Sequence, residues 1–452
     1  MNRLYSTFLS VFLLTAFTAN AQQPVSAEIA QQLQFTLDSA VKVMKLTGVS
    51  VNITMSDDKV WNAVSGYADA STQEPFNPEH LLWSGSIAKL FTGGVVLQLA
   101  EEGRLSLEDK IGSYFNDIPN VDPNVTLREM IKHRSGINEF LSQAASSQWY
   151  NNPDKVWTGR EVLETYLPAK SFNHGTNFQY SNSNFVLLAM VVEQVTGNTL
   201  GEEMRNRFFI PLGLNNTFFM PEQQPTAAVT PCWSDFNQDG KWDDQANFIL
   251  STSFASMVSG AGAMLTQPAD VSKYTRAVFG GELLSESTLA EMKQCTNVSF
   301  GPNSTGYGIS TMRYKFFNRE YFGHGGDISG FTTLTMHQPE TNLTLTLMIN
   351  MDLQNRVALA AALLKKVTLI TTGIAESDAH LTLSLVNPAN DQLTVFNPGT
   401  VAINAQVIGV DGRKVMDVIL KPGKSTSDLT ALKSGLYLLT DEHQHSIRFV
   451  KE

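Results

Sequence analysis

The 452-residue chain has little cysteine, no cluster of positive charge and, beyond its first residues, no long apolar run. Its two cysteines, Cys232 and Cys295, are far apart in sequence, so they fit two separate small hydrophobic residues as well as a disulfide. The net charge is -11 and the lysines and arginines are dispersed, which argues against nucleic acid or an anionic membrane surface as a partner. No internal stretch is long and apolar enough to span a bilayer.

The composition and the N-terminal segment predict an exported globular protein. Apolar residues make up 42% of the chain, which is enough for a sizeable core, and the length predicts two or three domains. Residues 1–21 have the order of a secretory signal, with Arg3 before the apolar stretch 4–17 and small residues around Asn20. We therefore expect the mature chain to begin near Gln22 and to leave the cytoplasm.

Hydrophobic periodicity predicts a sheet that is built from both ends of the first domain. The middle of the chain, 84–295, has the pattern of helices and loops. Helical spacing and strand alternation recur on both sides of it, with helices at 26–46 and 356–370 and strands at 49–55, 59–67 and within 307–351. The economical fold is α/β (α+β), an antiparallel sheet from both chain ends flanked by helices, with an inserted helical subdomain.

The pattern changes after residue 370. Residues 371–380 have the composition of a linker, which makes 22–370 one separate domain. From 381 to 452 short alternating strands recur every 8 to 12 residues between Asn-Pro, Pro-Gly, Asp-Gly and Ser-Gly turns. This spacing predicts a small C-terminal β-sandwich of the Ig-like kind.

The pattern Ser-x-x-Lys occurs three times, and only one copy lies in apolar surroundings. The copies that start at Ser39 and Ser56 lie in an amphipathic helix and in a polar turn. In the segment 83–100, by contrast, Lys89 is the only charged residue. We expect this helix to be buried, and a buried lysine with a lowered pKa is the general base that Ser86 would need. The alternative is an N-capping serine beside a lysine whose amine reaches water.

Two further segments place polar residues where an ordered loop is expected. Tyr180 and Asn182 lie just before the apolar helix expected at 185–195; a phenol can relay a proton, and an asparagine can both donate to and accept from an amide. Segment 323–330 has four glycines before an expected strand, which favours close approach of a ligand and an N–H directed at an oxyanion. The alternatives are an interfacial tyrosine, a turn asparagine and a flexible loop with a surface histidine, His324.

Taken in order, these segments resemble the serine β-lactamase and penicillin-binding protein superfamily, in its class C and DD-peptidase-like branch. The resemblance covers most of 30–370. It is carried by LLWSGSIAKLFTGGVVLQLAEEGRLSLEDKI, by VTLREMIKHRSGI, by GTNFQYSNSNFVLLAMVVEQVTG, by PLGLNNTFF and by the stretch 259–262. In the second segment Arg134 stands where the family has threonine, a change that we place outside the chemistry.

The resemblance implies a serine hydrolase that works without a metal or cofactor. Ser86 would attack a carbonyl and form an acyl-enzyme, while Lys89 and Tyr180 would manage the protons. Asn182 would orient the substrate amide. The implied substrate is a small peptide of the D-alanyl-D-alanine type, such as a peptidoglycan stem peptide, with small esters or β-lactams as alternatives.

The same resemblance assigns the glycine-rich segment to the substrate. The backbone N–H groups of Ser86 and Asp327 would form the oxyanion hole, with Gly325 and Gly326 beside it. His324 stands where many relatives carry the lysine of Lys-Thr-Gly. Relatives with histidine there include DD-peptidases, D-aminopeptidases and esterases, which weakens the case for a dedicated β-lactamase. A histidine is only partly charged near neutral pH, so it would bind a substrate carboxylate less firmly than lysine does.

The remaining segments bear on export and on metal. Residues 381–452 resemble the type IX secretion sorting domain, which implies contact with a secretion machinery and delivery to the outside of the cell or the outer-membrane surface; the alternative is a generic Ig-like accessory domain. Segment 235–246 resembles part of a calcium loop but has Ala246 where a bidentate glutamate is expected, so we predict no metal site. A surface binding protein that kept the fold without turnover is the alternative to an enzyme.

Overall fold

The computed structural model describes residues 23–235, 242–245, 251–352, 356–372, 384–385, 389, 391–397, 402–409, 413–441 and 446–451. The expected signal segment 1–21 lies outside these residues, as do most of the expected linker 371–380 and most of the calcium-like segment 235–246. The chain divides into two compact units, Met1–Lys366 and Val367–Glu452. Within the part that is described, no helix combines the length and the apolar character needed to cross a membrane.

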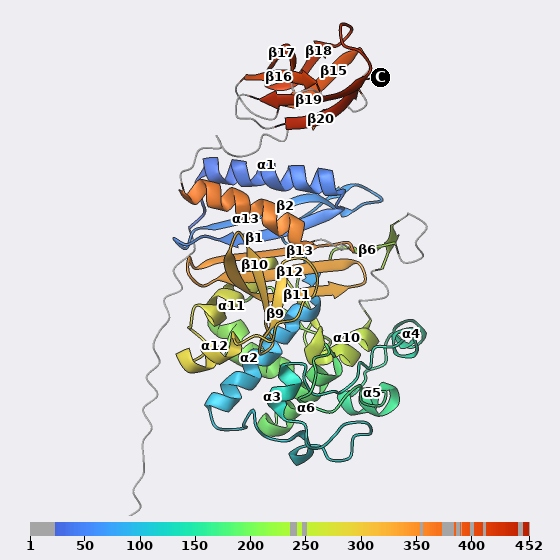
Figure 1. Cartoon of the computed structure of the whole chain (residues 1–452). Coiled ribbons are helices and arrows are strands. Elements are labelled where there is room, and N and C mark those ends of the chain that lie inside the picture. The colour runs from blue at the N-terminus through green and yellow to red at the C-terminus, as the bar shows by residue number, and fades with distance from the viewer. Residues whose placement is uncertain are drawn as a thin grey trace, which may run out of the picture. The chain divides into compact units, whose positions relative to one another are not determined.

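One eight-stranded antiparallel sheet organises the larger unit, with the strand order β3-β2-β1-β13-β12-β11-β10-β9 (Figure 1). Its strands are β1 (Gly48–Thr54), β2 (Val60–Asp69), β3 (Glu74–Pro75), β9 (Ser304–Tyr307), β10 (Met312–Phe316), β11 (Arg319–Ile328), β12 (Phe331–Gln338) and β13 (Leu343–Ile349). Val49 on β1 lies opposite Ile349 on β13, so segments about three hundred residues apart are neighbours in the sheet. This pairing confirms the prediction of a sheet made by both chain ends.

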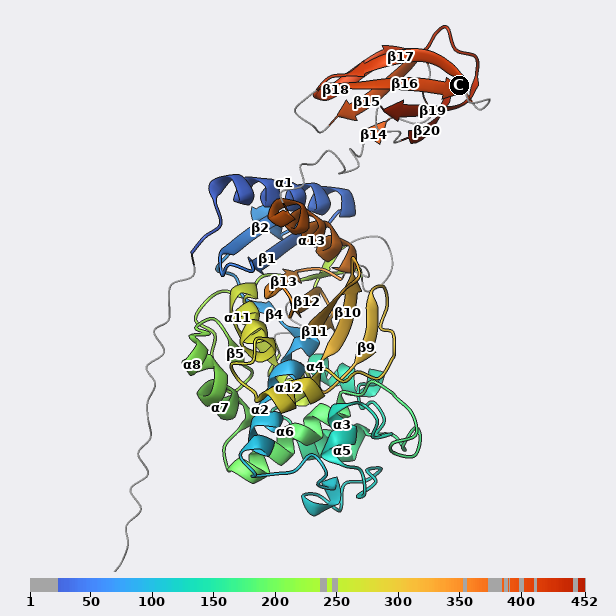
Figure 2. The same cartoon turned by 60° about the vertical axis from the view of Figure 1, so that its left-hand side comes forward.

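Helices cover both faces of this sheet (Figure 2). Helices α1 (Ala27–Met44) and α13 (Arg356–Thr372) lie on one face. Buried Leu33, Leu37 and Val41 recur every four residues on α1, so one stripe of the helix faces the strands. On the opposite face, α11 (Pro268–Phe279) packs against the sheet, and its Ser272 hydroxyl lies 2.8 Å from that of Thr346 on β13.

The predicted helical subdomain is inserted between β3 and β9. Its helical elements are η1 (Gly85–Ile87), α2 (Ala88–Glu101), η2 (Ile111–Ser113), α3 (Leu127–Ile131), α4 (Gln143–Asn151), α5 (Gly159–Tyr166), α6 (Ser183–Thr196), α7 (Leu200–Met204), η3 (Arg205–Phe209), α8 (Ile210–Leu212), α10 (Thr252–Val258), η4 (Ser259–Ala261), α11 and α12 (Glu286–Met292). Short strands β4 (Leu82–Trp83), β5 (Phe218–Phe219) and β8 (Met264–Thr266) form a small sheet, and β6 (Trp233–Ser234) pairs with β7 (Asp243–Asp244).

Helix α2 runs through the centre of this subdomain and is buried on nearly all sides. Two adjacent glycines allow this close packing. A Cβ atom on Gly93 would lie 2.2 Å from Ser310 Oγ, and one on Gly94 would lie 2.2 Å from Tyr274 Oη. The helix is therefore fixed tightly against its neighbours, and its N-terminal turn is held in one place.

The smaller unit contains two β-sheets with the strand orders β14-β15-β18 and β17-β16-β19-β20. The strands are β14 (Ser384–Leu385), β15 (Gln392–Asn397), β16 (Ile403–Gly409), β17 (Lys414–Leu420), β18 (Gly423–Asp428), β19 (Gly435–Asp441) and β20 (Ser446–Lys451). Val395, Val407 and Leu439 come from both sheets and share one buried cluster. The alternating sequence pattern therefore predicted the β-sandwich correctly.

Candidate active site

The serine that the sequence singles out lies on a tight turn before the buried helix α2. Ser86 is the middle residue of η1, and α2 begins two residues later. Among residues 81–90 it is the one that is not buried, so its side chain can meet a substrate. The turn depends on Gly85, whose φ of +53° lies in the left-handed region that favours glycine.

Lys89 is completely buried one helical turn below this serine. Its Nζ lies 3.0 Å from Ser86 Oγ, 2.6 Å from Asn182 Oδ1 and 2.7 Å from the carbonyl oxygen of Ala261. Burial lowers the pKa of Lys89 to about 7, and the Glu139 carboxylate opposes this shift. In its neutral form the amine can donate its two N–H groups to Asn182 and Ala261, which leaves its lone pair facing Ser86.

The other two Ser-x-x-Lys copies lie on the surface. Ser39 and Lys42 are both exposed on α1. In the polar turn, exposed Lys59 forms an ion pair with Asp57 at 2.6 Å. Neither lysine is desolvated, so only the copy at Ser86 has the environment of a general base.

Tyr180 lies beside both residues, on the loop that enters α6. The Lys89 amine is 5.0 Å from the centre of the Tyr180 ring. The tyrosine is half-buried as a whole, but its hydroxyl oxygen is inaccessible to solvent and completes no hydrogen bond with the described residues. Burial raises the pKa of Tyr180 far above its usual range, although interaction with the Ser86 hydroxyl opposes that effect. The side chain is therefore a neutral phenol near the serine.

Asn182 connects Lys89 to an acidic residue that the sequence analysis missed. While its Oδ1 accepts from Lys89, its Nδ2 and its backbone N–H donate to Glu139 Oε2 at 2.9 and 2.8 Å. The second Glu139 oxygen accepts from the backbone N–H of Leu141 at 2.9 Å. Glu139 lies two residues after the segment VTLREMIKHRSGI. The only local feature that could have indicated its role is that this acidic residue lies between the apolar residues Ile137 and Phe140.

Strand β11 presents an open edge next to Ser86. Its partner β12 pairs along 322–328, whereas β10 pairs only along 319–323. On the β10 side, the segment from His324 to Ile328 therefore has no neighbouring strand among the described residues. Within this segment Asp327 is exposed and Ile328 partly exposed, whereas 324–326 are buried.

The glycines of β11 bring this strand against the turn that carries Ser86. A Cβ on Gly326 would lie 2.2 Å from the carbonyl oxygen of Ser84 and 3.0 Å from the backbone nitrogen of Ser86. A Cβ on Gly85 would lie 3.2 Å from the backbone nitrogen of Asp327. The two N–H groups expected to form an oxyanion hole, those of Ser86 and Asp327, thus border the same narrow space.

The sequence led us to expect a partly charged His324 that contacts a substrate carboxylate or lies on the surface, and the structure differs from both. His324 is fully buried, with Nε2 3.2 Å from Tyr307 Oη and Nδ1 2.6 Å from the carbonyl oxygen of Gly325. Burial and the nearby Lys89 lower the pKa of His324 to about 3, so the ring is neutral at physiological pH. The exposed carboxylate of Asp327 forms an ion pair with Arg356 at the start of α13, a contact that the sequence did not indicate.

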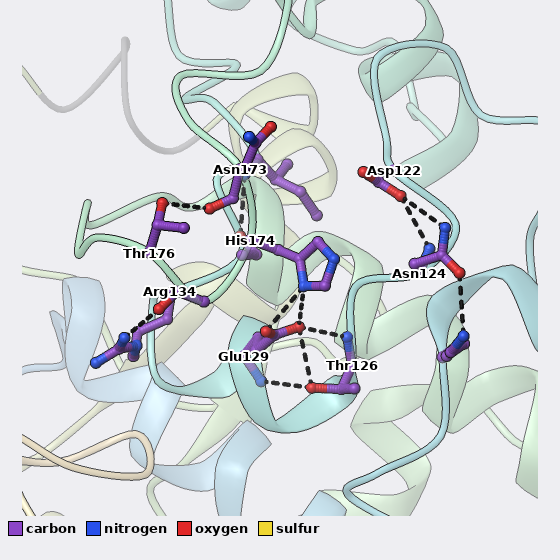
Figure 3. Close-up of polar contacts among 12 residues, drawn as sticks. Asp122, Asn124, Thr126, Glu129, Arg134, Asn173, His174 and Thr176 are labelled. Atoms are coloured by element: carbon purple, nitrogen blue, oxygen red, sulfur yellow. Dashed lines mark hydrogen bonds and ion pairs between the residues drawn. The ribbon is translucent and has the colours of Figure 1, made fainter.

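The loop that carries Tyr180 is anchored on the short helix α3 (Figure 3). Thr126 and Glu129 form a capping box at the start of α3. The two Glu129 oxygens lie 2.9 and 3.0 Å from His174 Nδ1, and the Arg134 guanidinium donates to the carbonyl oxygen of Gly175. Arg134, expected to be a local change, therefore ties α3 to the outer part of this loop.

The two cysteines take no part in the site. Both Cys232 and Cys295 are free thiols, and burial raises the pKa of each, to about 11 for Cys295. Cys232 packs against Gly330, where a Cβ would lie 2.8 Å from the Cys232 Cβ. Their roles are those of small hydrophobic residues.

Similarity to known proteins supports the assignment to a family. The chain is 20% identical over 304 residues to a penicillin-binding protein of Bacillus subtilis, a match that covers 65% of this chain and 66% of that protein. It is 25% identical over 291 residues to a D-aminopeptidase of Brucella anthropi, covering 64% of this chain and 53% of that protein. The chain thus spans less than two thirds of the length of these two curated relatives.

Solved structures share the fold. The D-amino acid amidase from Ochrobactrum anthropi SV3, complexed with L-phenylalanine amide, superposes with a TM-score of 0.68 at 24% identity, over 76% of this chain and 100% of that one. Two family models match the sequence: Beta-lactamase over residues 38–369 and Secretion system C-terminal sorting domain over residues 387–451. The sorting domain indicates type IX secretion to the cell surface or beyond. The chain therefore belongs to the Beta-lactamase family of serine hydrolases and carries a C-terminal sorting domain for export.

Proposed function

We propose that the protein is an exported hydrolase that forms an acyl-enzyme at Ser86. The observation that carries this proposal is the buried Lys89 amine, 3.0 Å from Ser86 Oγ and with a pKa of about 7. Near pH 7 about half of the molecules then hold this amine uncharged, ready to take the serine proton. Burial disfavours the charged form of a lysine, so a lysine with a purely structural role would not be stabilised by this environment. This argues against an inactive binding protein.

The proposed reaction uses groups of the protein for every proton transfer. Ser86 Oγ attacks the substrate carbonyl carbon while its proton moves to Lys89 Nζ. The carbonyl oxygen takes up negative charge beside the backbone N–H groups of Ser86 and Asp327. The Tyr180 phenol relays a proton from the lysine to the leaving group, and water then releases the acyl group along the reverse path. None of these steps requires a metal or cofactor.

The first substrate class that we propose is a peptide ending in D-alanyl-D-alanine, as in a peptidoglycan stem peptide. The open edge of β11 can pair with an extended peptide backbone. Asn182 donates one Nδ2 hydrogen to Glu139, and its second Nδ2 hydrogen can go to a substrate carbonyl. Similarity to a penicillin-binding protein and to a D-aminopeptidase supports a peptide with D-residues.

A second candidate is an esterase or a D-aminopeptidase, and the state of His324 favours it. That ring is neutral, and Arg356 is paired with Asp327, so neither offers a free positive charge to the terminal carboxylate of a substrate. The binding of an ester or an amide that has no terminal carboxylate does not depend on such a positive charge. Rapid hydrolysis of β-lactams on the same site is a further alternative.

For the sorting domain we propose recognition by the secretion machinery and delivery to the extracellular side of the outer membrane. The sandwich forms its own buried cluster, which includes Leu393, Leu420 and Phe449. It can therefore present a folded recognition unit that is independent of the hydrolase site.

The test is the intact mass of the mature chain after incubation with a penicillin, beside the Ser86→Ala variant. A lasting adduct on the wild type alone would support the acyl-enzyme and favour a DD-peptidase. Penicillin consumed without an adduct would favour a β-lactamase. If the penicillin survives, hydrolysis of a D-amino acid p-nitroanilide and of p-nitrophenyl acetate decides between an aminopeptidase and an esterase. Equal turnover by Ser86→Ala on every substrate would refute the proposal.

A further inference from the structure

A buried histidine, His133, contacts Tyr180 and the two residues next to it in the chain, Gln179 and Ser181. Its backbone carbonyl accepts from the backbone N–H of Gln179 at 3.0 Å. Its Nδ1 accepts from the backbone N–H of Ser181 at 3.1 Å. Between these two bonds, the His133 ring packs on the Tyr180 ring with 4.2 Å between centroids and 33° between planes. One residue thus fixes the backbone on both sides of Tyr180 and one face of its ring.

The protonation state of His133 follows from its partners. Nδ1 faces the N–H of Ser181 and lies 3.3 Å from Asn184 Nδ2, so it acts as an acceptor and the ring proton is on Nε2. Burial keeps the pKa of His133 well below its usual value, and Lys89 and His324 shift it in the same direction. The ring is therefore neutral, and both contacts with the tyrosine loop persist across the working pH range.

The backbone at His133 is strained, which is uncommon for a residue that is fully buried. Its φ is +55°, in the left-handed region that residues other than glycine, asparagine, aspartate and histidine rarely adopt. Such a conformation persists only where the surroundings enforce it. Here it allows the carbonyl oxygen and the ring of one residue to reach the same loop.

We infer that His133 is a positioning residue, which acts on the reaction by holding the Tyr180 phenol in place beside Ser86. This inference rests on the proposed role of Tyr180 in the acyl-enzyme mechanism. The contacts of Glu129 and Arg134 with His174 and Gly175 hold the outer part of the loop (Figure 3). Phe300 and Tyr307 also pack on the Tyr180 ring, and Asn138 accepts from the side chains of Gln179 and Ser181. His133 combines both kinds of contact, since it bonds the backbone on each side of Tyr180 and packs on the ring between them.

The substitution His133→Asn tests this role with little disturbance of the backbone. Asparagine accepts the left-handed conformation, keeps the backbone carbonyl and places Oδ1 near the position of Nδ1, but it lacks the ring that packs on Tyr180. We expect kcat for an activated ester to fall about 10- to 100-fold, because a reacting group displaced by about 1 Å costs on that order. KM should stay within about threefold, since His133 does not reach the substrate edge of β11. The matched control is His337→Asn, which alters a buried neutral histidine on β12 that packs on Phe279.

A double-mutant cycle with Tyr180→Phe separates positioning from a general loss of structure. If His133 acts through the tyrosine hydroxyl, adding His133→Asn to Tyr180→Phe should lower kcat by less than about twofold further. A loss in the double variant equal to the product of the two single losses would overturn the inference, as would wild-type kcat in His133→Asn. If thermal unfolding shows that His133→Asn does not fold, His133→Gly, which accepts the left-handed conformation and also lacks the ring, enters the same cycle.

The same experiments separate this inference from the proposed function. Turnover that survives in Ser86→Ala would remove the acyl-enzyme proposal itself. Full activity of Tyr180→Phe would remove the role of the tyrosine, and the inference with it, but would leave the acyl-enzyme at Ser86 in place. Low activity of Tyr180→Phe together with additive losses would refute His133 alone.

Discussion

The acidic residue Glu139 should set the pH at which the hydrolase becomes active. One amide separates it from Lys89, the proposed general base: Asn182 donates to Glu139 Oε2 at 2.9 Å and accepts from Lys89 Nζ at 2.6 Å. Its negative charge favours the protonated lysine and so opposes the lowering of the pKa by burial; the pKa of about 7 is the balance of these two effects. The substitution Glu139→Gln keeps the shape of the side chain and removes the charge.

The size of the effect follows from the bridging geometry. One amide group between the two charged groups corresponds to a separation of about 6 Å, at which an ion pair is worth about 3 kcal/mol for an effective dielectric constant of about 20. Water at the half-buried site weakens this, so a shift of about 1 to 2 pKa units is expected. In Glu139→Gln the pKa of Lys89 should therefore fall from about 7 to between about 5 and 6.

The assay is the pH dependence of kcat/KM for a neutral chromogenic ester, with Ser86→Ala as the background. In the wild type, activity should rise with pH through about 7 as Lys89 loses its proton. In Glu139→Gln the rise of kcat/KM should move to lower pH. The maximal kcat/KM should also fall, because both carboxylate oxygens of Glu139 accept hydrogen bonds and the NH₂ group of glutamine cannot accept one.

The matched control is Glu101→Gln, which removes an acidic residue from the last turn of the same helix α2. Twelve residues of helix separate Glu101 from Lys89 by about 18 Å, beyond the screening length of about 8 Å at physiological ionic strength. Its rise of kcat/KM with pH should match that of the wild type. An unchanged rise in Glu139→Gln would refute the assignment of Lys89 as the base or its coupling to Glu139.

Three further outcomes are expected. Lys89 binds its proton less tightly in the native protein than in the unfolded chain. The free energy of unfolding of the wild type, relative to that of Lys89→Met, should therefore rise between pH 7 and 10 by up to about 1.4 kcal/mol per pH unit. A difference that calorimetry finds to be independent of pH would contradict the lowered pKa. In Gly326→Ala, the new Cβ would lie 2.2 Å from the Ser84 carbonyl oxygen, so kcat/KM should fall about tenfold or more. In the control Gly262→Ala, the nearest atom to the new Cβ would be 3.7 Å away, so kcat/KM should stay close to the wild-type value. Deletion of 381–452 should block export, measured by fractionation, and leave ester hydrolysis by the purified protein unchanged; loss of that activity would mean that the sandwich contributes to the site.

Much of the fold could be predicted because its signals are local. The four-residue spacing of Leu33, Leu37 and Val41 marks α1, and alternation marks β12 and β13. The order of helices and strands then leaves few ways to build one sheet. One sheet made from both ends of the domain followed from that economy, whereas the register that sets Val49 opposite Ile349 did not.

The sequence by itself also placed together the two side chains on which the proposed function rests. Ser86 and Lys89 are three residues apart on one helical turn, and the lack of other charge in their segment indicates burial. Contacts over long sequence separations were decided only by the tertiary structure. They bring Asn182 and Glu139 to Lys89 and His133 to Tyr180, and they bury His324 in a neutral form. The physical reason is that spacing along the chain encodes which side chains share a helix face or a strand face, whereas pKa values and hydrogen-bond partners depend on what other segments place around them.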